Sequence, residues 1–503
     1  MAYFSEKKGG VILSYIGMVV NVIIKFLYTP FLLMALGQSD YGLFSLASSI
    51  VGYLAILDLG FGSAVTRYTV KYKSDNDSIK LYKLYSTVSL LYIIIGITAL
   101  IICLVLASLT TQLFGNTMNT EEVSKLKMML ILCGVNLLFT FPLQISSSVL
   151  SAYEKFVFKN LVNLVKYIAC PFTMVLLIYL VHIGAVGAIW VVTIFNFMAF
   201  FVMYLYSWKR LDFKISIAYI DFNLIKPLFN LSASMFMLMI FEQLQFNSGQ
   251  FILGMTQGAE VVAVWGIAMV FVLNFRSIST SITNVYMPTF FNLTFLEKWE
   301  DIQSYAIRMS RLQSYVLILL LANFIIWGKE FVFLWAGNKY SDAFDAASII
   351  MVPLTLALLF DFSYLIQIAQ KRLTYRILTL FIGYIISFIF VCLIFENIDI
   401  STYSYIIAAS IISSQIFGVM WYVKRQLNFV KIKEILINIV QIASVPISVA
   451  IVVLLLLHFT RLSIYSISNF IFYVLFYNII TISLFWFCCF NQSEKNLILR
   501  RGK

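Results

Sequence analysis

Apolar runs long enough to cross a lipid bilayer recur from one end of the chain to the other. A transmembrane helix needs about 20 mainly apolar residues. In the 503-residue chain 61% of the residues are hydrophobic and only 12% are charged, whereas a soluble domain carries about 25% charged residues. The runs are continuous and lack the alternation of membrane β-strands. The sequence therefore predicts an all-α polytopic membrane protein with about 14 transmembrane helices, at 10–36, 42–65, 84–109, 126–150, 161–181, 185–206, 227–255, 261–287, 307–331, 344–368, 377–395, 403–423, 435–459 and 468–490.

Basic residues gather in alternate links between these runs. The amino-terminal segment, the links after even-numbered runs and the carboxyl-terminal tail hold most of the lysines and arginines, whereas the opposite links hold little beyond Lys125, Lys127, Lys339 and Arg461. Membrane proteins keep such basic loops on the cytoplasmic side. The pattern predicts that both termini are cytoplasmic, and it accounts for the net charge of +12 without a nucleic-acid partner.

The spacing of the runs indicates two similar halves. The starts of runs one and seven, and of runs two and eight, are offset by about 216 residues, and Ala152-Tyr-Glu-Lys155 resembles Ala369-Gln-Lys371. Parallel repeats of this kind are found in transporters. We expect an N-lobe at 1–206, a C-lobe at 207–423, six helices in each around a central cavity, and at 424–503 two additional runs with a basic cytoplasmic tail.

Enzymatic and metal chemistry have little support in the sequence. The six cysteines lie in apolar runs without metal-ligand spacing, and the only histidines are His182 and His458. No link between runs exceeds about twenty residues, which leaves no room for a catalytic domain outside the membrane. We therefore expect a transporter without a cofactor, coupled at most to protons or sodium ions.

Lys25 is the first candidate for binding a substrate. It lies near the middle of run one, where Asn21, Lys25 and Tyr28 recur at helical spacing. A lysine in hydrocarbon costs about 2.5–3.5 kcal/mol, so this face should meet a cavity or another helix. The functional interpretation is that Lys25 holds an anionic group. The structural alternative is an ion pair with a carboxylate such as Asp58.

Run eight is the most polar of the runs. Arg276, Thr280 and Thr283 share one helical face. Guanidinium groups bind phosphate oxygens in bidentate fashion, so this face suits a wet surface for phosphate or sugar. The alternative is that the hydroxyls bond back to their own helix and that Arg276 belongs to an ion pair.

Two carboxylates also lie inside predicted membrane helices. Glu242, in run seven, is either a proton or sodium site or the counter-ion of Arg276, and the sequence leaves both open. Asp361, in run ten, is a weaker candidate for the same coupling role.

Three segments near the amino terminus carry a family resemblance. The segments 28–33 (YTPFLL), 36–43 (LGQSDYGL) and 57–62 (LDLGFG) resemble the opening of bacterial polysaccharide flippases. These are the Wzx-type translocases of O-antigen and capsule repeat units, within the multidrug/oligosaccharidyl-lipid/polysaccharide exporter superfamily. The specific similarity covers about the first eighty residues, and beyond them helix number and topology agree.

The resemblance implies a function and partners. It implies movement of undecaprenyl-diphosphate-linked oligosaccharide from the cytoplasmic to the outer leaflet of the bacterial inner membrane by alternating access, with a polysaccharide polymerase and a chain-length regulator as partners. Related lipid II flippases use basic residues on the first and eighth helices, where Lys25 and Arg276 fall here. They also carry a basic residue on the second helix, where this chain has Asp58, so a lipid II substrate is not expected.

Two other functions compete with this one. A drug exporter of the same superfamily would favour acidic residues in its cavity for cationic drugs, and Lys25 and Arg276 oppose that. An integral-membrane polysaccharide polymerase or glycosyltransferase would need a sizeable outer loop, and the links here are too short.

The charge pattern predicts the side of each loop. Reporter domains fused after Lys159 and after Lys214 are expected to signal from the cytoplasm, and those fused after His182 and after Asn397 from the outside. Activity of a phosphatase reporter and fluorescence of a cytoplasmic reporter measure the two sides. Reversed signals at two of these positions would overturn the topology.

Overall fold

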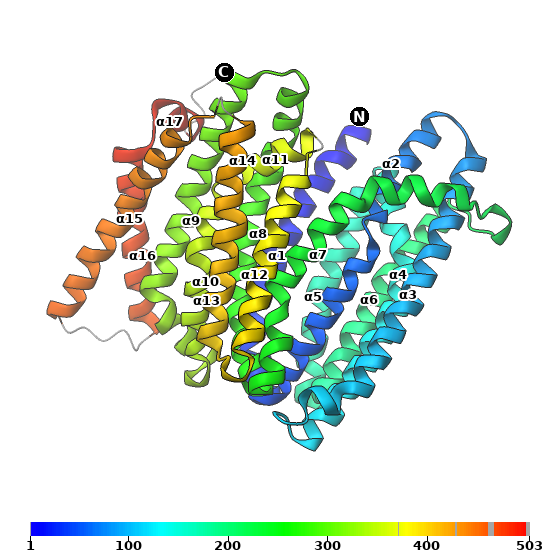
Figure 1. Cartoon of the computed structure of the whole chain (residues 1–503), viewed down its shortest axis with the longest axis horizontal. Coiled ribbons are helices and arrows are strands. Elements are labelled where there is room, and N and C mark those ends of the chain that lie inside the picture. Colours follow the sequence, from blue (N-terminus) through cyan, green and yellow to red (C-terminus); the bar gives the residue numbers. More distant parts are fainter. Residues whose placement is uncertain (1, 371, 428–429, 461–466, 499–503) are drawn as a thin grey trace. The chain divides into compact units, whose positions relative to one another are not determined.

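The protein is helical almost throughout the residues that the computed structural model describes, which are 2–370, 372–427, 430–460 and 467–498 (Figure 1). The chain forms two compact units. Unit 1 comprises Met1–Gly266 and Phe395–Asp399, and unit 2 comprises Ile267–Ile394 and Ile400–Lys503. The last residues of the expected basic tail, 499–503, and Lys371 of the expected repeat lie outside the described residues.

Twelve helices among the described residues are long and apolar enough to cross a membrane. The first, Ile12–Ser74, contains the first two predicted runs, and the seventh predicted run falls in α7 (Ile225–Gln257), which is not among the twelve. The predicted all-α, multi-span fold is confirmed, and the count of 14 is approximate.

Unit 1 is built mainly from the first six long helices. In Figure 1, α3, α4, α5 and α6 run side by side. Its elements are α1 (Ala2–Leu54), the short η1 (Ala55–Asp58), α2 (Phe61–Ser74), α3 (Ser78–Phe114), α4 (Thr120–Ala152), α5 (Phe156–Val181), α6 (Ala185–Arg210), η2 (Ile217–Tyr219), η3 (Phe222–Leu224), α7, the first turns of α8 (Ala259–Phe295) and η5 (Phe395–Asn397).

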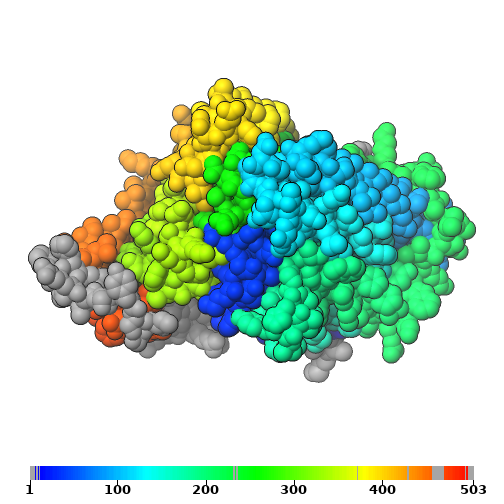
Figure 2. Space-filling model, turned by 90° about the horizontal axis from the view of Figure 1, so that it is seen from below, coloured from blue at the N-terminus to red at the C-terminus, as the bar shows by residue number. Residues whose placement is uncertain are grey.

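Helix α1 is broken at Gly37. This residue has φ 78° and ψ 176°, a backbone conformation outside the helical region that glycine adopts readily. Directly after it, the Ser39 hydroxyl donates to the Glu122 carboxylate, and Lys125 Nζ lies 3.0 Å from Asp40 Oδ1. Figure 2 looks onto this end of unit 1, where the turn between α3 and α4 (cyan) flanks the middle of α1 (dark blue). The predicted break after run one is therefore tied to the start of α4.

The residue Gly42 lets α1 approach the start of α8 within unit 1. A Cβ atom at Gly42 would lie 1.9 Å from the carbonyl oxygen of Ala259 and 3.2 Å from the backbone nitrogen of Ala263. Backbone cannot move aside as a flexible side chain can. Only glycine fits this contact.

Unit 2 holds the rest of α8 and all later helices except η5. Its elements are α9 (Trp299–Ala336), η4 (Asn338–Tyr340), α10 (Asp342–Leu358), α11 (Asp361–Ala369), α12 (Thr374–Leu393), α13 (Ile400–Ile411), the π-helix η6 (Ile412–Phe417), α14 (Gly418–Gln426), α15 (Ile432–Thr460), α16 (Ile467–Leu484), the π-helix η7 (Phe485–Cys489) and α17 (Gln492–Ile498).

The tenth predicted run is two helices, α10 and α11, separated at Leu359 and Phe360. The Ser310 hydroxyl of α9 donates to the Leu359 carbonyl over 2.8 Å. A carbonyl released by a helix break must find such a donor away from water. The break places Asp361 at the first position of α11.

The last two long helices pack against α9. Asn323 of α9 and Asn478 of α16 exchange side-chain hydrogen bonds of 3.0 and 2.8 Å. The Tyr477 hydroxyl donates to the Pro446 carbonyl of α15, and Trp327 packs with Val449 in the same buried cluster. The two additional C-terminal runs are therefore joined to α9 by polar as well as apolar contacts.

The lobes expected at 1–206 and 207–423 stay a prediction. The two units are groups of residues in contact, and their division falls within α8, after Gly266. Helix α7 contacts α1, α2 and α3 and so groups with unit 1.

We predict that Gly42→Ala destabilises the purified protein, because its Cβ would overlap the Ala259 carbonyl. Overpacking of this kind costs about 1–3 kcal/mol, so the melting temperature in detergent should fall. Gly17→Ala is the matched control on the same helix, since nothing lies within 4 Å of a Cβ there. Equal melting temperatures for the two variants would contradict the close approach.

Candidate functional site

Lys25 lies on α1 with its side chain exposed. Its carbonyl accepts a 2.6 Å hydrogen bond from the Thr29 hydroxyl, which involves the backbone alone. Among the described residues no carboxylate forms an ion pair with its ammonium group. Asn21 and Tyr28, the other members of the predicted polar face, are half-buried on the same helix. Lys25 is therefore an exposed residue without a carboxylate partner in the described part of the chain.

Asp58 has a different partner from the one that the structural alternative supposed. It ends η1, just before Leu59 and Gly60, which have φ values of 52° and 72°. The Tyr92 hydroxyl of α3 donates to Asp58 Oδ1. An ion pair between Lys25 and Asp58 is not found in the described structure. The carboxylate instead attaches the helix break to α3.

The two candidate hydroxyls of α8, on Thr280 and Thr283, both contact carbonyls of their own helix, the arrangement that the structural alternative for this run described. Thr280 Oγ1 donates to the Ser277 carbonyl over 2.9 Å, and Thr283 Oγ1 contacts the Ser279 carbonyl at 3.1 Å. Thr280 and Arg276 are half-buried, whereas Thr283 is only 5% exposed. Thr283 therefore lies in a helix interface rather than on an open wet face.

Thr283 joins a buried polar cluster in unit 2. Its Oγ1 donates to Asp361 Oδ2 of α11 at 3.4 Å, and the Gln313 amide of α9 donates to Ser279 and Thr283 at 3.0 and 3.2 Å. Asp361 is 7% exposed and Gln313 is fully buried. The structure thus brings two predicted residues, Thr283 and Asp361, into contact.

The remaining predicted residues are divided between the units. Lys25 and Glu242 belong to unit 1, and Arg276 belongs to unit 2. The expectation that Lys25 and Arg276 bind one headgroup from opposite lobes stays a prediction. The competing idea that Arg276 neutralises Glu242 stays one too.

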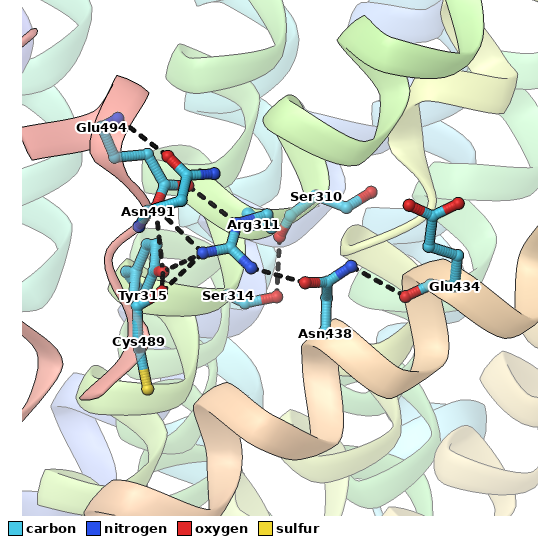
Figure 3. Close-up of polar contacts among 9 residues, drawn as sticks. All are labelled: Ser310, Arg311, Ser314, Tyr315, Glu434, Asn438, Cys489, Asn491 and Glu494. Atoms are coloured by element: carbon cyan, nitrogen blue, oxygen red, sulfur yellow. Dashed lines mark hydrogen bonds and ion pairs between the residues drawn. The ribbon is translucent and has the colours of Figure 1, made fainter.

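A largely buried ion pair in unit 2 was missed at the sequence level. Arg311 of α9 binds Glu494 of α17 through Nε to Oε1 at 2.8 Å and through Nη2 to Oε2 at 2.9 Å (Figure 3). The two side chains are 9% and 16% exposed. The same guanidinium donates to Asn438 of α15, to the Tyr315 hydroxyl and to the Cys489 carbonyl. Bidentate charge-assisted pairs are among the strongest polar contacts in proteins.

Glu494 also helps to cap the amino terminus of α17, which begins at Gln492. Its Oε2 accepts from the Asn491 backbone nitrogen, and its own nitrogen donates to Asn491 Oδ1, both over 2.9 Å. Burial raises the pKa of Glu494, but the hydrogen bonds from Arg311 and from the Asn491 nitrogen outweigh it and hold the pKa below the ordinary 4.5. Two sequence signals could have found the pair: an arginine inside run nine, and the capping-box spacing of Asn491 and Glu494.

Comparison with known proteins decides the family. A model of the polysaccharide biosynthesis protein family matches residues 8–294, more than half of the 503-residue chain. The chain belongs to this family. No curated protein sequence matches it.

Solved structures with the same fold are membrane transporters. The lipid II flippase MurJ in an inward closed conformation has a TM-score of 0.72 at 14% identity, over 95% of this chain and 98% of that chain. A multidrug resistance MATE family transporter of the MOP superfamily, in an inward-facing conformation, has a TM-score of 0.60 at 14% identity. That match covers 82% of this chain and 98% of the transporter. A MOP superfamily transporter from Pyrococcus furiosus has a TM-score of 0.56 at 15% identity, and the match covers 84% of this chain and 96% of that transporter. This member of the polysaccharide biosynthesis family is a multi-span membrane protein with the fold of these transporters.

We predict that Arg311→Leu destabilises this family member, because it leaves the Glu494 carboxylate half-buried without its cation. Breaking a buried pair costs about 3–5 kcal/mol, and the partial exposure of Glu494 lowers that figure. The double variant Arg311→Leu/Glu494→Leu should recover part of the loss, because it removes both charges. Thermal unfolding in detergent measures all three proteins.

The pH dependence has a definite sign. Because the pKa of Glu494 is lowered in the folded protein, the stability from its ionised form is present above its ordinary pKa and is lost as pH falls through the folded value.

The control for the Arg311 variants is Asp77→Asn, which removes an exposed pair with Lys80 and should leave the melting temperature unchanged. A double variant no more stable than Arg311→Leu would contradict the ion-pair account.

Proposed function

We propose that the protein moves undecaprenyl-diphosphate-linked oligosaccharide units from the cytoplasmic to the outer leaflet of the bacterial inner membrane by alternating access. The flipped units would serve the synthesis of O-antigen, capsule or exopolysaccharide. Family membership and a fold shared with a lipid II flippase support this proposal. A polysaccharide polymerase would then act on the flipped unit outside the membrane.

The observation that carries the proposal is Lys25, an exposed residue of a largely apolar helix that has no carboxylate partner within the described structure. A cation so placed is costly unless it meets water or an anion. Its partner carboxylate in the structural alternative, Asp58, is bonded to Tyr92 instead. A diphosphate headgroup is an anion of the right size and charge to bind the Lys25 ammonium group. The lipid tail stays in the membrane while the headgroup crosses.

Arg276 is proposed as the second cation. A diphosphate carries about two negative charges, and one exposed ammonium group in a wet cavity would hold it weakly. Asn21 and Thr280 are proposed as polar neighbours of these two cations, and Thr283, buried in its helix interface, acts through its contact with Asp361. Glu242 and Asp361 are the candidates for proton or sodium coupling.

Export of cationic drugs is the second candidate function, because MATE transporters share the fold. Carboxylates in the membrane helices, Glu242, Asp58 and Asp361, would then be the binding groups. The two functions predict different phenotypes for a deletion strain. Loss of the flippase leaves lipid-linked oligosaccharide on the cytoplasmic face, whereas loss of a drug exporter raises sensitivity to ethidium.

We predict that Lys25→Ala lowers export of the polysaccharide roughly tenfold or more, since a hydrogen bond to a charged group contributes about 1.5–3 kcal/mol. Lys25→Arg should retain part of the export because it keeps the charge. Lys127→Ala is the matched control, because it removes another exposed lysine outside the proposed site. Surface polysaccharide and membrane protein levels are measured in the same cells.

Combining variants separates the two roles of Arg276. If one headgroup is held by both cations, Lys25→Ala/Arg276→Ala should export little less than either single variant, because losing one cation already breaks the bridge. If Arg276 only neutralises Glu242, Glu242→Gln should restore much of the export lost in Arg276→Ala. Such a recovery, or unchanged export in Lys25→Ala, would overturn the two-cation mechanism.

A further inference from the structure

A cavity of about 960 Å³ opens at one end of unit 2, where α8 ends and α9 begins. Its walls come from the last turn of α8, from Trp299 at the start of α9, from the segment after α11 and from Gln426 at the end of α14. Figure 1 places the labelled helices α11 and α14 at the same end of unit 2. The links at this end are those that the charge pattern predicts to be cytoplasmic.

One wall carries a buried hydroxyl without a partner. Thr294 is 8% exposed, lines the cavity, and its Oγ1 makes no hydrogen bond within the described structure. A threonine on a helix commonly bonds to the carbonyl one turn earlier, and Thr280 on the same helix does so. Buried hydroxyls are almost always satisfied. A ligand in the cavity would supply the missing partner.

Planar polar groups on the opposite wall are already held in place. Gln426 Nε2 donates to the Tyr375 hydroxyl at 2.9 Å, and its Oε1 accepts from Arg372 Nη1 at 3.4 Å. Gln370 Oε1 accepts from the Tyr422 hydroxyl at 3.3 Å, and its amide nitrogen has no hydrogen bond to another described residue. Amides and guanidinium groups of this kind bond pairs of neighbouring hydroxyls, because each presents several donors or acceptors in one plane.

Aromatic rings complete the lining. Phe291, Phe295 and Trp299 all border the cavity, and Phe295 is 86% exposed. Aromatic rings offer flat apolar faces to the C–H faces of a sugar ring. Among the described lining residues the charged ones are Glu297 and Arg372, which have opposite signs. The described lining therefore lacks the surplus of positive charge that a diphosphate needs, and it suits an uncharged polyol.

We infer that this cavity binds sugar rings, as a glycan subsite distinct from the lysine on α1. Its volume falls within the range of pockets for small ligands, about 300–1,000 Å³. The source of the glycan rests on the proposed function. The subsite then holds the oligosaccharide of the lipid-linked unit at the predicted cytoplasmic side. Trp299 and Phe295 stack on the rings, and Thr294 and Gln426 bond to their hydroxyls.

Photocrosslinking in cells tests the subsite without knowledge of the sugar. The full chain carries the photoreactive substitution Phe295→p-benzoylphenylalanine, and a second version carries it at Phe172, a 69% exposed residue of α5. After irradiation, mass spectrometry of the purified protein identifies adducts that contain hexose or aminosugar fragments. We expect sugar adducts at Phe295 and phospholipid adducts at Phe172.

Second-position variants make the test specific. In the Phe295 version, Trp299→Ala and Gln426→Ala should each lower the yield of sugar adduct at least about fivefold, as loss of one or two ligand contacts would. Trp208→Ala, an exposed tryptophan of α6 outside the cavity, should leave the yield unchanged. Phospholipid-only adducts at Phe295, equal sugar adducts at Phe172, or a yield insensitive to Trp299→Ala would each overturn the subsite.

The proposed function fails in a different measurement. If deletion of the protein does not cause lipid-linked oligosaccharide to accumulate, the flippase proposal is wrong whatever the adducts show. If accumulation occurs but no sugar adduct forms at Phe295, the flippase proposal stands and the subsite is overturned.

Discussion

A membrane-spanning chain must satisfy its backbone hydrogen bonds within itself, and the structure depends on this constraint. Helices satisfy it everywhere except where they break. Three of these breaks in the described structure contact side chains of a neighbouring helix in the same unit. Asp40, after the kink at Gly37, binds Lys125 of α4. Asp58, at the left-handed turn before α2, binds Tyr92 of α3. The carbonyl of Leu359, between α10 and α11, accepts from Ser310 of α9.

The same breaks account for the positions of the candidate coupling groups. Asp58 and Asp361 both lie at helix breaks, where polar groups from two helices already converge. The contact of Asp361 with Thr283, and of Thr283 with Gln313, creates a buried polar cluster inside an otherwise apolar unit. A proton or ion could bind such a cluster without disturbing the regular helices beside it.

Arg311 and Lys25 both lie on long apolar helices, but their surroundings differ. The guanidinium of Arg311 contacts Glu494, Asn438, Tyr315 and the Cys489 carbonyl (Figure 3). These contacts attach α15 and α17 to α9. Among the described residues Lys25 has no such set of partners, and its side chain is exposed. We propose that Arg311 is structural, whereas Lys25 is available to a substrate. The cavity beside Thr294 adds a third environment, whose described lining is polar and has no surplus charge; we propose that it holds the sugar portion of a lipid-linked glycan.

The sequence by itself determined the class of protein, the helical architecture, the break near Gly37, and the position of Lys25 inside an apolar run. These follow from apolar length, glycine placement and the energetic cost of charge in hydrocarbon, all of which act locally along the chain. Only the tertiary structure decided the partners: Tyr92 rather than Lys25 for Asp58, Asp361 for Thr283, and Glu494 for Arg311. Those pairs join residues 34, 78 and 183 positions apart. Helical periodicity shows which face a residue lies on, but which distant side chain meets that face depends on how the helices pack.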